Sequence, residues 1–154
     1  MRSMKTCPLC AALETPGKLT PLAKLGECDV FLNDKQGCLG WCVLVLREHV
    51  EHMDAMTLER QARVFGEVAL AARALRQHFG PVRINYECLG NQVHHVHWHV
   101  IPRHADDPDP KNAIWGWPAE RLAGAMSDEA RASLAAALKA GLMNVAAATA
   151  RARE

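Results

Sequence analysis

The chain has 154 residues, with 18 basic and 17 acidic side chains and no run of like charge. This length is sufficient for one domain with its own hydrophobic core. The charge balance excludes the basic surface that follows a nucleic-acid polymer or an anionic membrane, so we expect neither as a partner. The N-terminus lacks the apolar segment of a signal peptide, and the longest apolar run, 39–46, is too short to span a bilayer. We therefore expect a cytoplasmic protein whose six cysteines are reduced.

Short strands and turns are predicted in the first two thirds of the chain, and helices in two places. One helix is predicted from residue 58 to about His78, with Thr57 as its N-cap. A second helix begins after Ser127 and continues through an alanine-rich tail. Strands are predicted at 19–25, 29–33, 41–46, 82–88 and 93–102. Strands joined by short turns favour an antiparallel sheet with helices on one side, which is the α+β class.

No linker, repeat or low-complexity segment divides the chain, so residues 1–154 are predicted to form a single domain. The strand at about 93–102 ends the sheet in this prediction. Residues 105–154 then form a C-terminal extension that contains helices.

Four of the eight histidines lie within six residues, as His94, His95, His97 and His99. Side chains alternate between the two faces of a strand, so the last three would line one face and His94 the other. An exposed histidine-rich face, a metal-binding tract and hydrogen-bonded core histidines are alternative interpretations. The regular alternation with large apolar residues favours a half-buried functional strand.

A row of imidazoles on a strand is suited to chemistry at phosphorus. A neutral imidazole nitrogen is a competent nucleophile near neutral pH when the other ring nitrogen donates a hydrogen bond. Phosphoryl transfer otherwise needs mainly positioning and stabilisation of charge, which flanking imidazoles can supply. The row therefore indicates a site for a phosphate group.

Cys7-Pro8-Leu9-Cys10 is a C-x-x-C motif, whose spacing allows two thiolates to bind one zinc ion. Such a site needs two more ligands. A redox pair or an incidental pair of cysteines remains an alternative for these four residues taken alone.

The segment from His95 to Ile101 resembles the His-φ-His-φ-His-φ-φ signature of the histidine triad (HIT) family, in which φ is hydrophobic. Pro102-Arg103 follows it, as in many members, and the resemblance covers roughly residues 7–104. It implies a HIT-like fold, with an antiparallel sheet of about five strands, a long helix packed on it and additional C-terminal helices. It also implies a homodimer and activity as a nucleotide hydrolase or transferase.

The resemblance assigns roles to individual residues. His97 occupies the position of the nucleophile that takes the nucleotidyl group, and His95 and His99 are the flanking catalytic positions. Asn33 matches the residue that binds the ribose hydroxyls, although a turn residue is the alternative. Asn85 and Gln92 match polar residues that contact the phosphate.

A branch of the family carries the same cysteine motif and completes a zinc site with two histidines. The matching positions here are His49 and His95, which with Cys7 and Cys10 imply one structural Zn²⁺ per chain. His95 would then serve mainly to anchor the start of the catalytic strand.

Three tryptophans depart from the family pattern. Trp41 stands where the family usually has a histidine, so the class of nucleotide is not determined by the resemblance. Trp115 and Trp117 have no match in short members. They are expected either to anchor the C-terminal helices or to form a lid over a base or against a partner subunit.

The preferred hypothesis is a hydrolase that cleaves at the α-phosphorus of a nucleoside phosphate anhydride, ester or phosphoramidate. Its substrates would resemble dinucleoside polyphosphates or adenosine phosphoramidate. A nucleotidyltransferase, a nucleotide-binding regulatory protein with little turnover and a metal-handling protein are the alternatives. Contact with a polyphosphate, or simple solvent exposure, is expected for Arg103, Lys111 and Arg121.

Overall fold

Five antiparallel strands form one sheet, in the spatial order β1-β2-β3-β5-β4. This is a computed structural model, and it describes residues 6–152. The predicted α+β class and the five-stranded sheet are confirmed. The strands are β1 (Thr20–Lys24), β2 (Cys28–Leu32), β3 (Cys42–Leu46), β4 (Arg83–Glu87) and β5 (His97–Arg103).

The two long helices begin at the predicted N-caps. The Thr57 hydroxyl accepts a hydrogen bond from the Arg60 amide, and the Ser127 hydroxyl accepts one from the Ala130 amide. Gly80, at a φ of 57°, ends the first of these helices in the left-handed conformation that glycine adopts without strain. The helices are α1 (Pro8–Glu14), α2 (Leu58–Phe79), α3 (Ala119–Ala123) and α4 (Asp128–Arg151), with 3-10 turns η2 (Met53–Ala55) and η3 (Ile114–Gly116).

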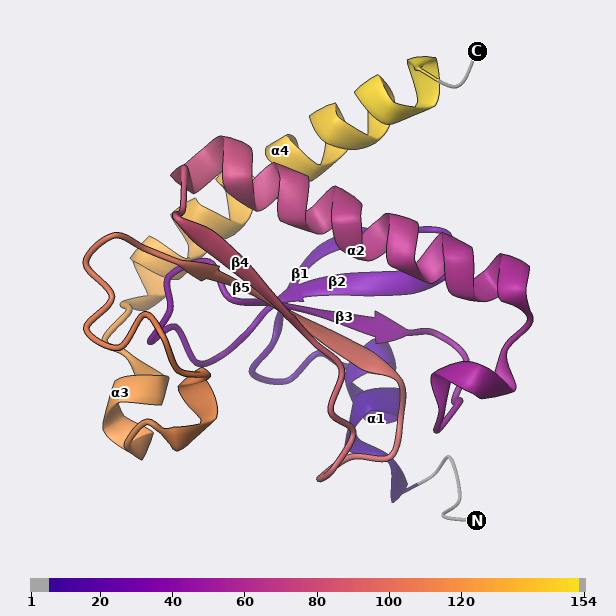
Figure 1. Ribbon diagram of the computed structural model, residues 1–154, viewed down its shortest axis with the longest axis horizontal. Helices are drawn as coiled ribbons and strands as arrows, with labels where there is room; N and C mark the ends of the chain where they lie inside the picture. The colour runs from indigo at the N-terminus through magenta and orange to yellow at the C-terminus, as the bar shows by residue number, and fades with distance from the viewer. Residues whose placement is uncertain (1–5, 153–154) are drawn as a thin grey trace.

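The main core lies between one face of the sheet and the helices α2 and α4 (Figure 1). Alternate residues of the central strands, such as Leu44 and Val100, pack there against Val68 and Leu138. The opposite face of the sheet is covered by α1 and by the loops that precede α4. His97 pairs with Val45 and His99 with Val43, so both imidazoles lie on this opposite face.

The strand that carries the histidines is shorter than predicted, because it begins at His97 rather than at residue 93. The His95 amide donates to the Val93 carbonyl at 2.9 Å, and the Val96 amide donates to the Val50 carbonyl at 2.7 Å. These bonds turn the backbone before β5. His95 therefore owes its direction to this turn and not to the alternation of a strand.

The sequence prediction missed α1, which begins directly after Cys7. Pro8 at the first helical position is the signal that could have revealed it, since proline is favoured there. The cysteine motif is thus the first turn of a helix whose Leu9 and Leu13 pack on Phe31 of the sheet.

The C-terminal extension packs against the rest of the domain through buried polar and aromatic residues. Arg103 is 2% exposed, and its guanidinium donates to Asp107, to Asn85 and to the carbonyls of Asn112 and Asp109. The Arg121 guanidinium lies 3.7 Å from the centre of the buried Trp117 ring. Arg103 is accordingly neither available to a polyphosphate nor exposed to solvent, so both expectations for this residue were wrong.

α4 is, among the described residues, a helix long enough and apolar enough to cross a membrane by length and composition alone. Core helices of globular proteins satisfy the same criterion. Here the side chains Ala135, Leu138, Leu142 and Val145 are buried, and the helix lies against α2 and β1. This buried stripe of α4 therefore joins the domain core.

Candidate functional site

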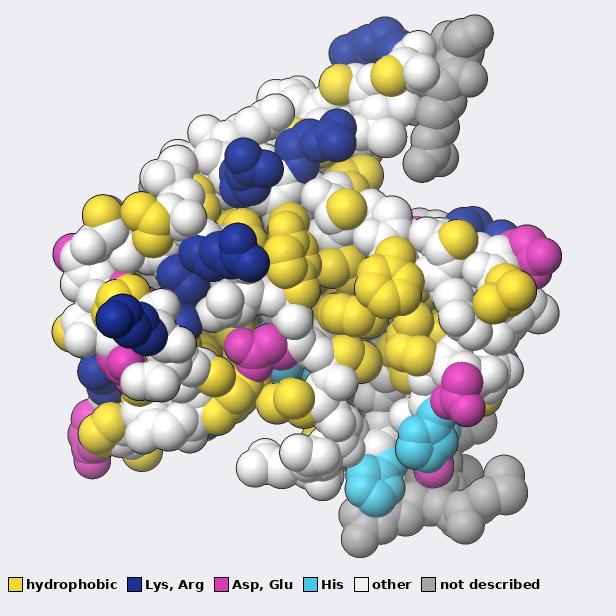
Figure 2. All heavy atoms as spheres, in the orientation of Figure 1, with side chains coloured by type: hydrophobic (Ala, Val, Ile, Leu, Met, Phe, Trp, Pro, Cys, Tyr) yellow, Lys and Arg dark blue, Asp and Glu magenta, His cyan; other side chains and the backbone are white. Residues whose placement is uncertain are grey.

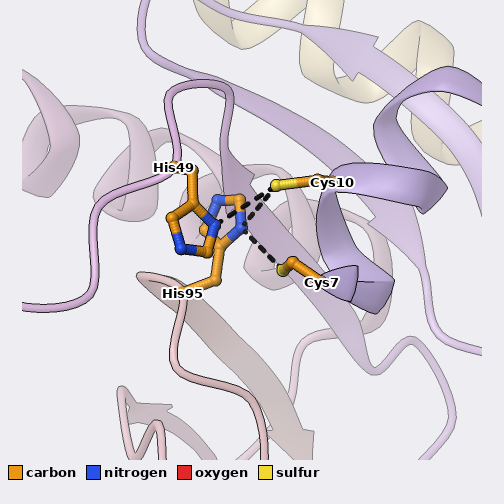
Figure 3. A group of neighbouring side chains, drawn as sticks. All are labelled: Cys7, Cys10, His49 and His95. Carbon is orange, nitrogen blue, oxygen red and sulfur yellow. Dashed lines mark hydrogen bonds between the residues drawn. The ribbon is translucent and has the colours of Figure 1, made fainter. Parts of the chain in front are cut away.

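Four side chains that could hold a metal ion converge at the start of α1, and they are the four predicted from the sequence (Figure 3). Cys7 and Cys10 come from the start of α1, His49 from the segment after β3, and His95 from the turn before β5. Their ligand atoms all lie within 4.8 Å of one another. Cys7 Sγ is 3.3 Å from His95 Nδ1, and Cys10 Sγ is 3.3 Å from His49 Nδ1.

The two sulfur–nitrogen separations of 3.3 Å fit a tetrahedral zinc ion. Zinc bonds of about 2.0–2.3 Å place neighbouring ligand atoms roughly 3.3–3.8 Å apart. The His95 Nε2 lies 2.7 Å from the Leu46 carbonyl oxygen, which can only accept, so the hydrogen is on Nε2. The lone pair of Nδ1 therefore faces the two sulfurs, and the backbone has selected the tautomer that a metal requires.

The surroundings of the Cys10 thiol oppose its ionisation. Burial, and then the adjacent Cys7 thiol, raises the pKa of Cys10 to about 11. Zinc ligation displaces the thiol proton and so removes this obstacle to forming the thiolate. Two thiolates and two imidazoles form a closed set that leaves no position for a substrate, which is typical of structural zinc.

His97 is oriented by the backbone of its neighbour. Its Nδ1 lies 2.6 Å from the carbonyl oxygen of His95, and this oxygen can only accept a hydrogen bond. Nδ1 therefore carries the proton, and Nε2 keeps its lone pair. This is the tautomer that a nucleophilic histidine needs.

His99 has a different environment. Trp41 Nε1 donates a hydrogen bond to His99 Nδ1 at 3.1 Å, and the rings of His97 and His99 lie edge to face with centroids 5.2 Å apart. Burial, and then the neighbouring His97, lowers the pKa of His99 to about 4. His99 is consequently a neutral imidazole at neutral pH.

His97 and His99 line a cavity of about 560 Å³, a volume typical of sites for small molecules. The cavity lies between the loop after β2, the β4–β5 loop, and η3. Its wall is formed by Asn33, Asp34, Lys35, Trp41, Leu89, Gly90, Asn91, Gln92, Val93, His97, His99 and Trp115.

The structure brings Asn33 and Gln92 to this cavity, as expected for substrate ligands. It does not bring Asn85 there. The Asn85 Oδ1 accepts a hydrogen bond from Arg103 at 2.8 Å, and its side chain lies in the wall of a neighbouring surface cavity. His95 also stays outside the cavity wall, fully buried behind His97.

One feature of the cavity was not predicted from the sequence. Arg131, on α4, donates to the backbone carbonyls of Asn33 at 2.8 Å and Asp34 at 2.5 Å, and so fixes the loop after β2. No sequence pattern could reveal a bond between residues 98 positions apart.

Trp115 and Trp117, which have no match in short family members, each have one of the two roles expected for them. Trp117 anchors the extension, whereas Trp115 lines the cavity.

Comparison with known proteins agrees with this description. The sequence profile of the HIT domain matches residues 20–106. Protein hit of Bacillus subtilis (strain 168) is 32% identical over 103 residues, which are 62% of this chain and 70% of that protein.

Solved structures agree over almost the whole chain. A histidine triad protein from Sinorhizobium meliloti 1021 has a TM-score of 0.75 at 28% identity, covering 90% of this chain and 99% of that one. A zinc-bound histidine triad family protein from Mycobacterium smegmatis has a TM-score of 0.70 at 17% identity, covering 95% of this chain and 99% of that one. At 17% identity, the similarity to the Mycobacterium smegmatis protein shows the fold alone.

The profile match covers more than half of the chain, and it includes β1 to β5 and the three alternating histidines. The sheet and the long helix are those expected from the resemblance. The chain belongs to the histidine triad (HIT) family, whose members are usually nucleotide hydrolases or transferases.

Proposed function

We propose that this protein is a nucleotide hydrolase that cleaves at the α-phosphorus of a nucleoside phosphate anhydride, ester or phosphoramidate. The observation that carries the proposal is the 2.6 Å bond between His97 Nδ1 and the His95 carbonyl oxygen. It leaves Nε2 as the one nitrogen of His97 with a lone pair. The cavity lined by this ring provides the space for a phosphate group.

The reaction has two displacements at phosphorus. His97 Nε2 attacks the α-phosphorus, and the bond to the leaving group breaks with its electron pair going to that group, which takes a proton from solvent where it leaves as an amine or alcohol. Water then attacks the same phosphorus and gives up a proton to solvent, the N–P bond breaks with its electron pair returning to Nε2, and nucleoside monophosphate is released with neutral His97 restored. His99 donates a hydrogen bond to a phosphoryl oxygen, and Asn33 and Gln92 bind the nucleotide.

One structural Zn²⁺ per chain belongs to this proposal, held by Cys7, Cys10, His49 and His95. When bound, the ion links α1 to the turn before β5. The backbone of His95, in turn, holds the nucleophile. The ion is therefore expected to support the geometry of the site without contacting the substrate.

The test is hydrolysis in ¹⁸O-labelled water, with adenosine phosphoramidate and a dinucleoside polyphosphate as separate substrates. We expect AMP that carries one ¹⁸O atom at phosphorus, since water is the final acceptor. Unlabelled nucleotide transferred to an added alcohol or phosphate acceptor would instead identify a nucleotidyltransferase. Binding of AMP without release from either substrate would contradict hydrolysis and favour a regulatory role.

A homodimer is also part of the proposal. β4 is an edge strand, and Figure 2 shows hydrophobic side chains gathered beside α2 on the face in view. Leu58 and Phe65 of α2, and Val82 and Tyr86 at β4, are at least 50% exposed. Exposed apolar side chains beside an edge strand favour this part of the surface as an interaction site.

Sedimentation equilibrium tests the dimer. We expect a mass twice that of the 16.9 kDa chain, and dissociation to the monomer on Phe65→Arg because a charge would be buried at the contact. Met143→Arg is the matched control, since Met143 is 71% exposed on α4. A wild-type protein of 16.9 kDa at all concentrations would rule out the dimer.

A further inference from the structure

Trp41 lies directly behind His99. The indole is 2% exposed, immediately precedes β3, and packs with Ile101, Ile114 and Trp117. Its Nε1 is 3.1 Å from His99 Nδ1, and the two rings are edge to face with centroids 5.6 Å apart. The contact is between buried or half-buried groups, so solvent does not substitute for it.

The direction of this hydrogen bond is determined by chemistry. An indole N–H can donate but cannot accept, so His99 Nδ1 must be the acceptor and cannot carry a hydrogen while the bond exists. The neutral ring must then carry its hydrogen on Nε2. A histidine at position 41 would not impose this constraint, because imidazole can donate or accept.

The charged groups around His99 do not favour a second proton on its ring. Glu87 lies opposite His99 on β4, but its carboxylate accepts a hydrogen bond from Trp115 Nε1. His97 adjoins on β5, and Asp34 and Lys35 line the same cavity from the loop after β2. Among residues 6–152, no carboxylate is hydrogen-bonded to His99.

We propose that Trp41 is a positioning residue that holds His99 as a neutral Nε2–H donor, which gives the reacting phosphoryl group a hydrogen bond but not a proton. The consequence for the reaction rests on the proposed function. His97 is then the one triad imidazole in the cavity that changes its bonding during turnover. The tautomer itself is a property of the free protein and can be measured without a substrate.

The test is the ring ¹⁵N spectrum of histidine-labelled, zinc-loaded protein across pH 5–8. His99→Asn identifies the His99 signals by their disappearance. In the wild type we expect an unprotonated Nδ1 and a protonated Nε2 throughout. In Trp41→Phe we expect a mixture of tautomers and marked protonation of His99 at pH 5, because the loss of one ordinary hydrogen bond raises its pKa by about one unit.

Trp117→Phe is the matched control, because it truncates a second indole of the same cluster whose Nε1 faces Asp109. It should leave the His99 tautomer and pKa unchanged. A proton on Nδ1 in the wild type would overturn the proposal, and this result does not require any variant to fold. So would a Trp41→Phe protein whose tautomer and pKa equal those of the wild type.

Measurements of nucleotide release distinguish a failure of this proposal from a failure of the proposed function. If the tautomer is as expected but no nucleotide is released, the proposed function fails and the role of Trp41 in setting the tautomer stands. If turnover occurs, Trp41→Phe should show a new acidic limb in its pH profile, whereas Trp117→Phe should not. A new limb in both variants would indicate a packing effect and contradict the proposal.

Discussion

Replacing His97 with alanine is expected to lower the rate of nucleotide release by about a thousandfold or more, as removal of a covalent nucleophile typically does. The physical reason is that His97 provides the one nucleophilic nitrogen that the backbone orients in the cavity. His99 cannot replace it, because Trp41 engages its Nδ1. The measurement is steady-state release of AMP by purified wild-type and variant protein.

His94→Ala provides the matched control, since His94 is exposed and adjacent in sequence but lies outside the cavity wall. It should retain the wild-type rate. Labelled nucleotide should remain on the wild-type protein after an alkaline quench, which preserves an N–P bond, and should be absent from His97→Ala. Equal rates for His97→Ala and wild type would exclude His97 as the nucleophile.

Cys7→Ser is expected to eliminate binding of the one zinc ion proposed per chain and to destabilise the protein. The ion would join α1, the segment after β3 and the turn before β5, which are distant in the sequence. Its binding contributes about 4 kcal/mol to the free energy of unfolding when free zinc exceeds Kd a thousandfold. Elemental analysis gives the zinc content, and urea unfolding in the presence of zinc gives the loss of stability.

Cys88→Ser is the corresponding control, because Cys88 is a half-buried free cysteine outside the cluster. This variant should keep one zinc and most of its stability. A Cys7→Ser protein with undiminished zinc would contradict the assignment of the ligands. More than one zinc per wild-type chain would support the alternative of a metal-handling protein.

Cys7→Ser should also lower the catalytic activity, though less than His97→Ala. His95 is bound at three points: Nε2 to the Leu46 carbonyl, Nδ1 toward the metal cluster, and its own carbonyl to His97. Loosening the ring would allow the carbonyl to shift and with it the tautomer of the nucleophile. Zinc content and catalytic rate are therefore expected to fall together.

Much of this arrangement could be predicted from local patterns. The alternation of His97, Trp98, His99 and Val100 assigns side chains to the two faces of a strand, and the register with β3 confirms it. Thr57 and Ser127 indicated where the long helices begin. These predictions succeed because capping and strand alternation depend on residues within a few positions of one another.

Other features depend on contacts that no local pattern encodes. Val93 to Val96 look like strand residues, but pairing with Val50 and Leu46 turns them out of β5. Asn85 looked like a phosphate ligand, but Arg103 holds its side chain away from the cavity. In both cases a distant partner determines the direction of the side chain.

The sequence by itself was sufficient for the family, the α+β class and the four cysteine and histidine residues that the structure brings together, and it predicted the position of the nucleophile. Only the three-dimensional structure indicated which ring nitrogen of His95, His97 and His99 carries the hydrogen and which keeps its lone pair. Leu46 determines this for His95, the His95 carbonyl for His97, and Trp41 for His99. The reason is physical: residue type specifies that an imidazole is present, whereas its tautomer depends on the hydrogen-bond partner that the fold places beside it.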